Sequence, residues 1–261
     1  MNLAPDTDHR GLGFVGLSPA ILALDVRRML RNRRTAIFSL VMPVIFFLIF
    51  GTNSAFAKIK VGTGNVSADV MISMALYGAV LSTASAGAMV SIERAAGWSR
   101  QLRITPLSPF AYIAAKMLVA LLLGAVSVAS VYAAGAIVGD PSLPVQDWVL
   151  TAIFAWAGSV LFAAFGLFAG YLLPSENVMQ IMGFALMLFA FGGGLFIPLS
   201  QYSPTLRTIA EFTPLYGLSQ IVHYPLFGKG FDWVWVLNLL VWLAIFSAGA
   251  TWRFRRDTAR V

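Results

Sequence analysis

The chain has 261 residues, of which 59% are hydrophobic and only 11% are charged, and its mean hydropathy is +0.80. A soluble domain carries about a quarter charged residues, so much of this chain is not built to face water. There is no cysteine, which excludes disulfides, thiolate metal sites and a cysteine nucleophile. In so apolar a chain, the net charge of +7 fits anionic membrane lipid rather than nucleic acid.

The N-terminal region divides into a tail and a basic helix. Residues 1–17 are polar and glycine-rich and are predicted to form a mobile tail. Residues 18–34 open with Ser18 and Pro19, an N-cap followed by proline at the first helical position. Apolar residues then recur at helical spacing among basic ones, which predicts an amphipathic helix lying in the lipid headgroup layer. A flexible basic leader is the alternative. The arginines expected on the polar face of this helix are Arg27, Arg28, Arg31 and Arg34.

Six apolar stretches follow, each close to the length of about 20 residues that crosses a bilayer as a helix. The predicted spans cover residues 36–55, 68–92, 110–138, 148–173, 178–198 and 233–252. In the second span Gly78, Ser82 and Ala86 fall four apart, which favours close helix packing. We expect Lys116 to be the only ionisable side chain within the spans and to extend toward the interface. Proton- or ion-coupled carriers need carboxylates or histidines at mid-depth, so this expectation argues against a secondary transporter.

The segments outside the spans set the orientation. Residues 199–231 form a proline- and tyrosine-rich stretch that is expected to be irregular, and residues 253–261 form a basic tail. With both termini in the cytoplasm, cytoplasmic segments hold thirteen arginines, whereas the outer loops hold four basic residues. The positive-inside rule therefore predicts that both termini are cytoplasmic, and we expect a multi-pass protein of the bacterial plasma (inner) membrane.

Residues that resemble chemical sites are sparse. His9 and His223 lie far apart in the sequence without an acidic cluster, so neither is predicted to bind metal or to act in catalysis, and His223 is read as an interfacial polar group. No Walker A motif occurs, so we do not expect the chain to be an enzyme that hydrolyses ATP by that route. Asn65, Val66 and Ser67 match a glycosylation pattern on an outer loop, which is a common chance match.

The loop between the second and third spans is the most informative segment. It alternates charged and apolar residues, as expected for a short helix that docks in a groove of another protein. Two prolines, Pro106 and Pro109, would end that helix and restart the third span. The residues that stand out are Glu93, Arg94, Gly97, Trp98, Leu102, Arg103, Thr105, Pro106 and Leu107.

This loop resembles that of the type-2 transmembrane family of ABC transporter permeases, whose fold is the type V exporter fold. Members carry E-R-x-x-G-x-x-x-x-L-R-x-T-P-L after the second span, and residues 93–107 match it. The resemblance extends over nearly the whole chain, including GGGLFIPLSQYSPTLRTIAEFTPLYGLSQIVHYPLFG at 192–228, which is similar to the end of the family's fifth span and its outer re-entrant helices. It implies an all-α membrane protein with six transmembrane helices.

The resemblance further implies a half-transporter. Two permease subunits, identical or related, would pair with two separate ABC ATPase subunits that bind ATP and Mg²⁺, and this chain would hold no cofactor. The loop at residues 93–108 would be the coupling helix seated on the ATPase, with Glu93 and Arg94 in polar contacts and Trp98 and Leu102 in apolar ones. Capping helices and anchoring the loop at the interface is the structural alternative for these residues.

The substrate pathway implied by the resemblance is the dimer face lined by spans one, two and five. Its candidate residues are Phe46, Phe47, Tyr77, Phe189, Phe191 and Gly193. A hydrophobic pathway suits export of a hydrophobic drug, an antibiotic or a lipid. A permease for lipid-linked polysaccharide, an integral membrane enzyme and a membrane scaffold without a transport role remain as alternatives.

Overall fold

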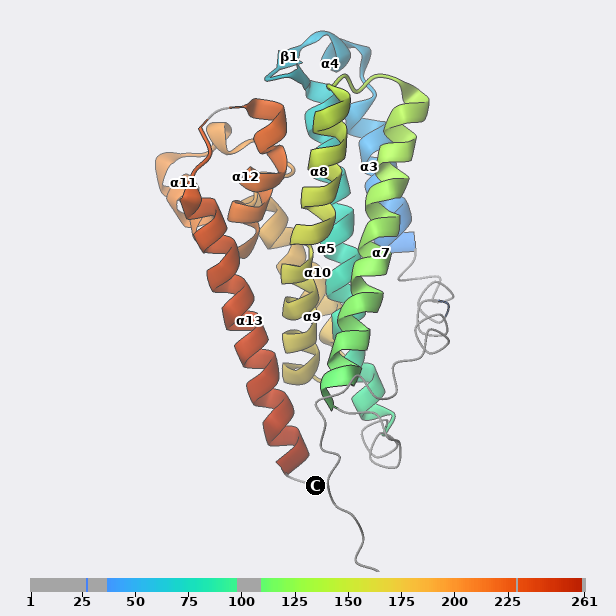
Figure 1. The fold of residues 1–261 in the computed structure, drawn as a ribbon, viewed down its shortest axis with the longest axis vertical. Helices are drawn as coiled ribbons and strands as arrows, with labels where there is room; N and C mark the ends of the chain where they lie inside the picture. The colour runs from blue at the N-terminus through green and yellow to red at the C-terminus, as the bar shows by residue number, and fades with distance from the viewer. Residues whose placement is uncertain (1–26, 28–36, 98–108, 229, 260–261) are drawn as a thin grey trace, which may run out of the picture.

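The computed structural model describes residues 27, 37–97, 109–228 and 230–259, and these residues form a mostly helical membrane protein (Figure 1). Among them, four helical stretches are long and apolar enough to cross a membrane. They are α5 (Val66–Ala95), most of α7 (Pro109–Val138), α8 (Val145–Gly158) continued by α9 (Val160–Leu172), and most of α13 (Trp233–Ala259).

Two shorter apolar helices stand where the first and fifth spans are expected. They are α3 (Met42–Gly51), preceded by the π-helical turn Ile37–Val41, and α10 (Val178–Gly192). With 10 and 15 residues, α3 and α10 fall short of a bilayer crossing by length alone. Four long helices and two short ones therefore occupy the places of the six expected spans.

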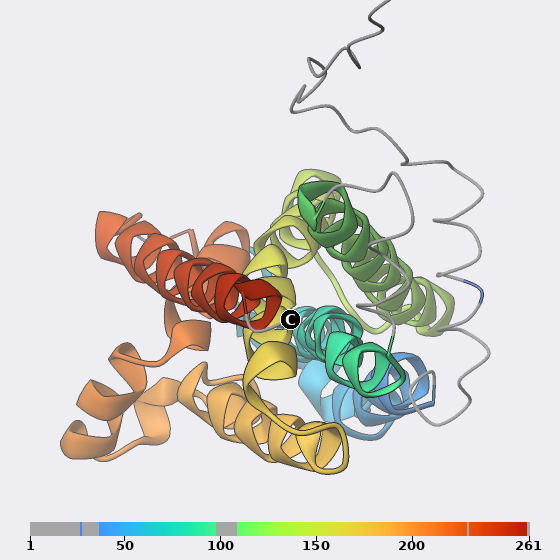
Figure 2. The ribbon, with the colours of Figure 1, turned by 90° about the horizontal axis from the view of Figure 1, so that it is seen from below.

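Helix α5 is the central element of the bundle, with α3, α7, α9 and α10 packed around it (Figure 2). Small residues permit this packing. A Cβ atom added at Gly166 of α9 would lie 2.0 Å from the carbonyl oxygen of Ala84, and one at Gly87 would lie 2.5 Å from the backbone nitrogen of Leu167. Gly78, Ser82 and Ala86 are all buried, so the close-packing surface expected on the second span is confirmed.

The π-helical turn is fixed to α5 and α7 through one backbone carbonyl. The carbonyl oxygen of Ser39 accepts hydrogen bonds from the Ser82 hydroxyl at 3.3 Å and from the Ser127 hydroxyl at 3.1 Å. Ser82 and Ser127 come from different helices, so the entry to α3 is held where α5 and α7 meet. In an apolar surrounding, hydrogen bonds from hydroxyl side chains help to hold helices together.

One end of the bundle is capped by short elements. They are α4 (Ser54–Lys58), the antiparallel strands β1 (Lys60–Val61) and β2 (Gly64–Asn65), the 3-10 turn Leu199–Gln201, α11 (Pro204–Glu211) and α12 (Pro214–Phe227). The expected all-α fold thus contains one two-stranded hairpin. The stretch 199–231, expected to be irregular, holds two helices that each begin with proline at the first turn, where a missing N–H costs nothing.

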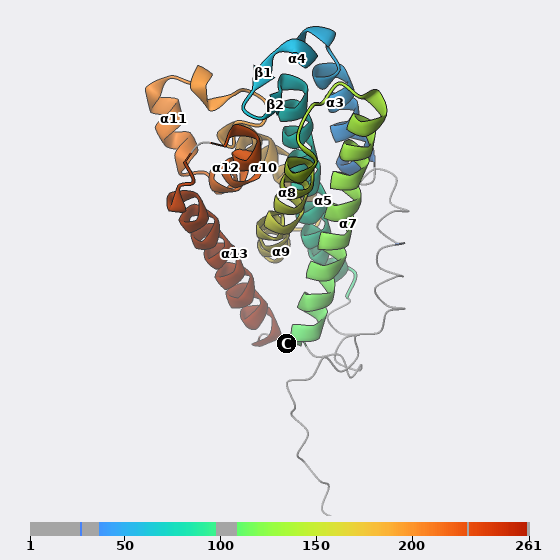
Figure 3. The same cartoon turned by 45° about the horizontal axis from the view of Figure 1, so that its top comes forward.

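Several helix limits differ from the expected spans, for local reasons. The helix in the first stretch ends at Gly51, because Asn53 caps α4 by accepting from the backbone N–H of Ala55. The helix of the fifth stretch ends at Gly192, the first of three successive glycines. In contrast, α13 continues to Ala259, so the basic tail begins as the last turns of a helix. These turns, the end of α5 and the start of α7 lie at the end of the bundle opposite the hairpin (Figures 1 and 3).

Candidate functional site

Glu93, in the last turn of α5, is a buried carboxylate with two cross-helix partners. The Lys116 ammonium lies 2.7 Å from its Oε1, and the Tyr112 hydroxyl donates to its Oε2. The side chains of Glu93 and Lys116 are only 6% and 11% exposed. Lys116 supplies the partner that a buried carboxylate requires, and its expected extension toward the membrane interface stays a prediction. The pair joins the end of α5 to the start of α7.

Arg94 joins α5 to the end of α9. Its Nη1 donates to the carbonyl oxygens of Gly170 at 3.3 Å and Tyr171 at 3.1 Å, and its guanidinium lies 5.4 Å from the centre of the Tyr171 ring. The last carbonyls of a helix lack partners within the helix and carry partial negative charge, so a cation is favourable there. The Ser91 hydroxyl adds a hydrogen bond of 2.9 Å to the carbonyl of Leu173.

These contacts form a cluster that we call the polar clamp. Its members are Ser91, Glu93, Arg94, Tyr112, Lys116 and Tyr171. The Tyr171 ring also packs edge-on against Phe254 of α13, with ring centres 5.7 Å apart. The polar clamp thus gathers α5, α7, α9 and α13 at one end of the bundle, and α5 and α7 are the helices that precede and follow residues 98–108 in the sequence.

Gly97 marks the point where the chain leaves α5. Its φ of +78° is in the left-handed region that glycine adopts without strain, and a Cβ added there would meet nothing within 4 Å. The other expected coupling residues lie outside the described residues: Trp98, Leu102, Arg103, Thr105, Pro106 and Leu107. So do Arg28, Arg31 and Arg34 of the expected interfacial helix, whereas Arg27 is helical and exposed.

The structure brings some of the expected pathway residues together. Tyr77 of α5 packs edge-on against Phe196 with ring centres 5.0 Å apart, and Phe191 at the end of α10 lies 5.3 Å from the same ring. Phe191 is 37% exposed, so this aromatic group reaches the surface. A Cβ added at nearby Gly193 would come within 2.8 Å of the Leu215 side chain.

The remaining pathway candidates lie elsewhere in the bundle. Phe47 is fully buried in the main core, and Phe46 is half-buried with its ring 6.1 Å from that of Phe50. Phe189 points to a different aromatic group, with its ring 5.4 Å from Phe165. Of the six candidates, Tyr77 and Phe191 are therefore the two that share one aromatic group.

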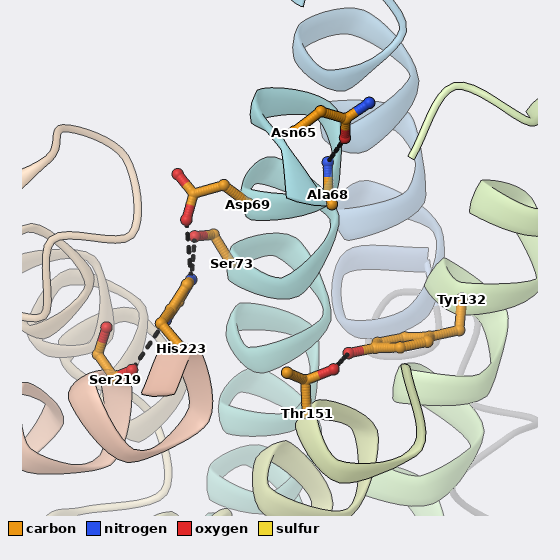
Figure 4. Close-up of polar contacts among 8 residues, drawn as sticks. All are labelled: Asn65, Ala68, Asp69, Ser73, Tyr132, Thr151, Ser219 and His223. Atoms are coloured by element: carbon orange, nitrogen blue, oxygen red, sulfur yellow. Dashed lines mark hydrogen bonds and ion pairs between the residues drawn. The ribbon is translucent and has the colours of Figure 1, made fainter. Parts of the chain in front are cut away.

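A polar group that sequence reasoning missed joins α5 to α12 (Figure 4). His223 Nε2 lies 3.0 Å from the Ser73 hydroxyl and 3.5 Å from Asp69 Oδ1, and its Nδ1 lies 2.8 Å from the carbonyl oxygen of Ser219. One expectation is wrong here: Lys116 is not the only ionisable side chain in the predicted spans, because Asp69 lies within residues 68–92. His223 is buried within the chain, and its position relative to the membrane interface stays a prediction. The sequence signal for this group was the spacing of Asp69 and Ser73, which places the two polar side chains one turn apart on the same face of a helix.

Two further polar contacts hold the same half of the bundle. The Tyr132 hydroxyl of α7 lies 2.7 Å from the Thr151 hydroxyl of α8 (Figure 4). Asn65 is 3% exposed; its amide donates to the carbonyls of Ala57 and Asp140, and its Oδ1 accepts from the N–H groups of Ala68 and Ser142. With its amide nitrogen occupied in this way, Asn65 is not an accessible glycosylation acceptor in the folded chain.

Within the described part of the chain, no three histidine, cysteine, aspartate or glutamate residues come close enough to hold a metal ion. Two comparisons with known proteins address the whole chain. Residues 19–227 match the family described as ABC-2 type transporter. The chain is also 26% identical over 236 residues to "Putative transport permease YvfS" of Bacillus subtilis (strain 168), an alignment covering 90% of this chain and 96% of that protein.

Proposed function

Because this chain belongs to the ABC-2 type transporter family, we propose that it is the permease subunit of an ATP-driven exporter. A separate ABC ATPase binds ATP and Mg²⁺ and supplies the energy, while this chain provides the path across the membrane. The observation that carries the proposal is the polar clamp, whose members Glu93 and Arg94 precede residues 98–108 in the sequence and whose member Lys116 follows them. Those residues are the coupling helix in this proposal.

The polar clamp explains how a pull on the coupling helix would reach the spans. A force on residues 98–108 acts on the end of α5 and the start of α7 together, because Lys116 and Tyr112 hold Glu93 between the two helices. Arg94 passes the displacement to α9 through its carbonyl contacts. Packed helices then tilt or slide as units, which is the shear type of transition.

The proposed assembly contains two permeases and two ATPases. Support for a second permease comes from the apolar surfaces that α3 and α10 leave exposed on either side of α5. Their exposed residues are Ile45, Leu48, Ile49 and Phe50 on α3, and Ile181, Phe184, Met187, Leu188 and Phe191 on α10. In this arrangement Tyr77 and Phe191 line the face between the two permeases, which suits a hydrophobic drug, an antibiotic or a lipid-like substrate.

The proposed location is the bacterial plasma membrane, with six crossings and both termini in the cytoplasm. The basic last turns of α13 and the polar clamp occupy one end of the bundle, which is the cytoplasmic end under the positive-inside rule. Helices α11 and α12 would then be outer re-entrant helices. Leu206, Ile209 and Phe212 support this, because each is more than half exposed and all three are apolar.

The proposal is tested by co-purification. The tagged chain is expressed with an ATPase encoded beside it, and the same is done with residues 98–108 replaced by a Gly/Ser segment of equal length. The replacement begins after Gly97, so that the polar clamp stays intact. A Gly/Ser replacement of residues 228–231, at the opposite end, is the matched control. We expect the ATPase to co-purify with the intact chain and the control only. Failure of the ATPase to bind the intact chain would favour a membrane scaffold instead.

A further inference from the structure

The group formed by Asp69, Ser73, Ser219 and His223 has no part in the proposed coupling mechanism. It lies at the end of the bundle opposite the polar clamp, where the first turns of α5 meet α12 (Figure 4). The side chains of His223 and Asp69 are 8% and 26% exposed, so the imidazole is enclosed while the carboxylate keeps partial contact with the surface. We infer that Asp69 and His223 form a proton-binding site, in which a protonated imidazole is held by the carboxylate.

The argument starts from the hydrogen bond at Nδ1. A backbone carbonyl oxygen can only accept, so the contact of 2.8 Å to Ser219 requires that His223 Nδ1 carries a hydrogen. In a neutral imidazole the second nitrogen, Nε2, would then present a lone pair. That lone pair would face Asp69 Oδ1 at 3.5 Å, which is repulsive if the aspartate is ionised.

A second proton on the ring removes this repulsion. With Nε2 protonated, the imidazolium donates toward the Ser73 hydroxyl at 3.0 Å and attracts the Asp69 carboxylate. Asp69 is also in the first turn of α5, where the partial positive charge of the helix N-terminus stabilises an anion. The Ser73 hydroxyl can donate to a bare Nε2 or accept from a protonated one, so the Asp69 carboxylate is the group that favours the doubly protonated ring.

The other charged groups near α12 are directed elsewhere. Of the described elements that pack on α12, α8 contributes Asp147, which accepts from the Thr63 hydroxyl at 2.8 Å, and α11 contributes Glu211 and Arg207, which pair with each other at 3.7 Å. Helix α10 holds no charged residue, and the charged residues of α13 are in its last turns at the opposite end. Asp69 is therefore the charged group in the described chain that the structure pairs with His223.

The proton has a structural consequence. Around His223, α12 meets the core through apolar side chains, among them Leu215, Val222 and Leu226. The bond between Asp69 and His223 is a charged link across this apolar contact between α5 and α12. Deprotonation of the ring would turn the attraction into repulsion, and protonation of Asp69 would remove its charge. Occupancy of the site by one proton therefore favours the packed arrangement of α5 and α12.

The inference is tested by nitrogen NMR of the full-length chain in lipid nanodiscs, with ¹⁵N-labelled histidine. The chain has only two histidines, so His9→Gln leaves His223 as the single signal. An imidazolium shows two protonated ring nitrogens, whereas a neutral ring shows one protonated and one bare nitrogen. At pH 7 we expect two protonated nitrogens in the His9→Gln chain, and loss of the Nε2 proton when Asp69→Asn is added.

Two controls make the outcome decisive. Asp147→Asn removes a carboxylate at the same end that does not face His223, and it should leave both nitrogens protonated. Ser73→Ala removes the hydroxyl without changing charge and should do the same. A neutral ring in the His9→Gln chain at pH 7 would overturn the inference, and this result does not depend on whether Asp69→Asn folds. The measurement involves no ATPase, so it is independent of the exporter proposal.

Discussion

At the scale of single residues, Glu93 shows how a carboxylate is kept inside an apolar bundle. It is 5% exposed, and its two oxygens are contacted by the Lys116 ammonium and the Tyr112 hydroxyl from one neighbouring helix. A buried charge that loses its partner is far more costly than an apolar pair of the same size. The charge pair therefore fixes which residues of α5 and α7 meet, more than it adds to the total stability.

A double-mutant cycle on this pair tests that view. Lys116→Met leaves Glu93 buried without its cation and should lower the free energy of unfolding in detergent by about 3 kcal/mol. Glu93→Gln combined with Lys116→Met removes both charges and keeps similar volumes, so the double variant should be more stable than Lys116→Met alone. If the losses of unfolding free energy measured for Glu93→Gln alone and for Lys116→Met alone simply added in the double variant, the two residues would not be coupled as the structure shows.

Asn65 is a second residue expected to stabilise the fold, because four backbone groups from three segments form hydrogen bonds with its side-chain amide. Asn65→Ala should lower the free energy of unfolding by about 3 kcal/mol, since it removes a helix cap and leaves buried polar groups without partners. Asn53→Ala is the matched control: Asn53 also caps a helix but is exposed, and its loss should cost about 1 kcal/mol. Equal losses of unfolding free energy in Asn65→Ala and Asn53→Ala would contradict this role of Asn65.

Sequence reasoning found part of these residue-level features. Glu93 and Arg94 were singled out by the loop motif and Lys116 by its charge, but their pairing was not predicted. No local pattern says which turns of two helices face each other, so the partners Tyr112 and Tyr171 were not predicted either. The pairing of Ser73 with His223 spans 150 residues, so neither it nor the pairing of Asp69 with His223 could be predicted from sequence spacing. Contacts between residues within one helical turn can be predicted from a sequence, whereas contacts between distant helices depend on how the bundle assembles.

At the scale of elements, the contact between α5 and α9 sets how closely the central helices approach. Gly166 and Gly170 of α9 face backbone atoms of α5, with added Cβ atoms 2.0 Å and 3.1 Å from the carbonyl oxygens of Ala84 and Gly87. A backbone atom cannot rotate away as a side chain can, so any side chain at Gly166 would push the two helices apart. Small residues at helix interfaces serve this purpose in membranes, where apolar burial does not drive association.

Glycine replacement tests this contact. Gly166→Ala should lower the free energy of unfolding by about 3 kcal/mol or prevent assembly, because the helices would have to separate. Gly183→Ala in α10 is the control: a Cβ there meets nothing within 4 Å, and alanine favours a helix by about 1 kcal/mol over glycine. Circular dichroism and detergent unfolding of both variants give the comparison. A Gly166→Ala chain as stable as the Gly183→Ala chain would show that α5 and α9 do not approach so closely.

The elements themselves were largely predictable, and their limits less so. The six apolar stretches correspond to helices because apolar composition over some 20 residues leaves the backbone no other way to satisfy its hydrogen bonds in lipid. The ends of α3 and α10 depend instead on Asn53 and on the glycines after α10, whose effects are local. The residue pattern of 199–231 was interpreted as irregular because the stretch is rich in proline, although proline opens both α11 and α12; the family resemblance alone implied helices there.

At the scale of the whole molecule, the bundle has two differently built ends. One end carries the polar clamp, the basic turns of α13 and the connection through residues 98–108. The other carries the hairpin, α11, α12 and the site formed by Asp69 and His223. Helix α5 runs between them and contributes Glu93 to one end and Asp69 to the other. Movement at the polar clamp is therefore expected to reach the opposite end through this single central helix.

The central claim, that residues 98–108 drive the helices through the polar clamp, is tested most directly by spin-label distances. The chain contains no cysteine, so Ala95→Cys on α5 and Ala248→Cys on α13 can be labelled together, in complexes with the ATPase diluted by unlabelled chain. We predict that the distance distribution between the two labels changes when ATP is added, and that the change disappears with Arg94→Gln, which removes the contact of the polar clamp with α9 and leaves residues 98–108 in place to bind the ATPase. Identical distributions with and without ATP, in a complex that still hydrolyses it, would contradict the account.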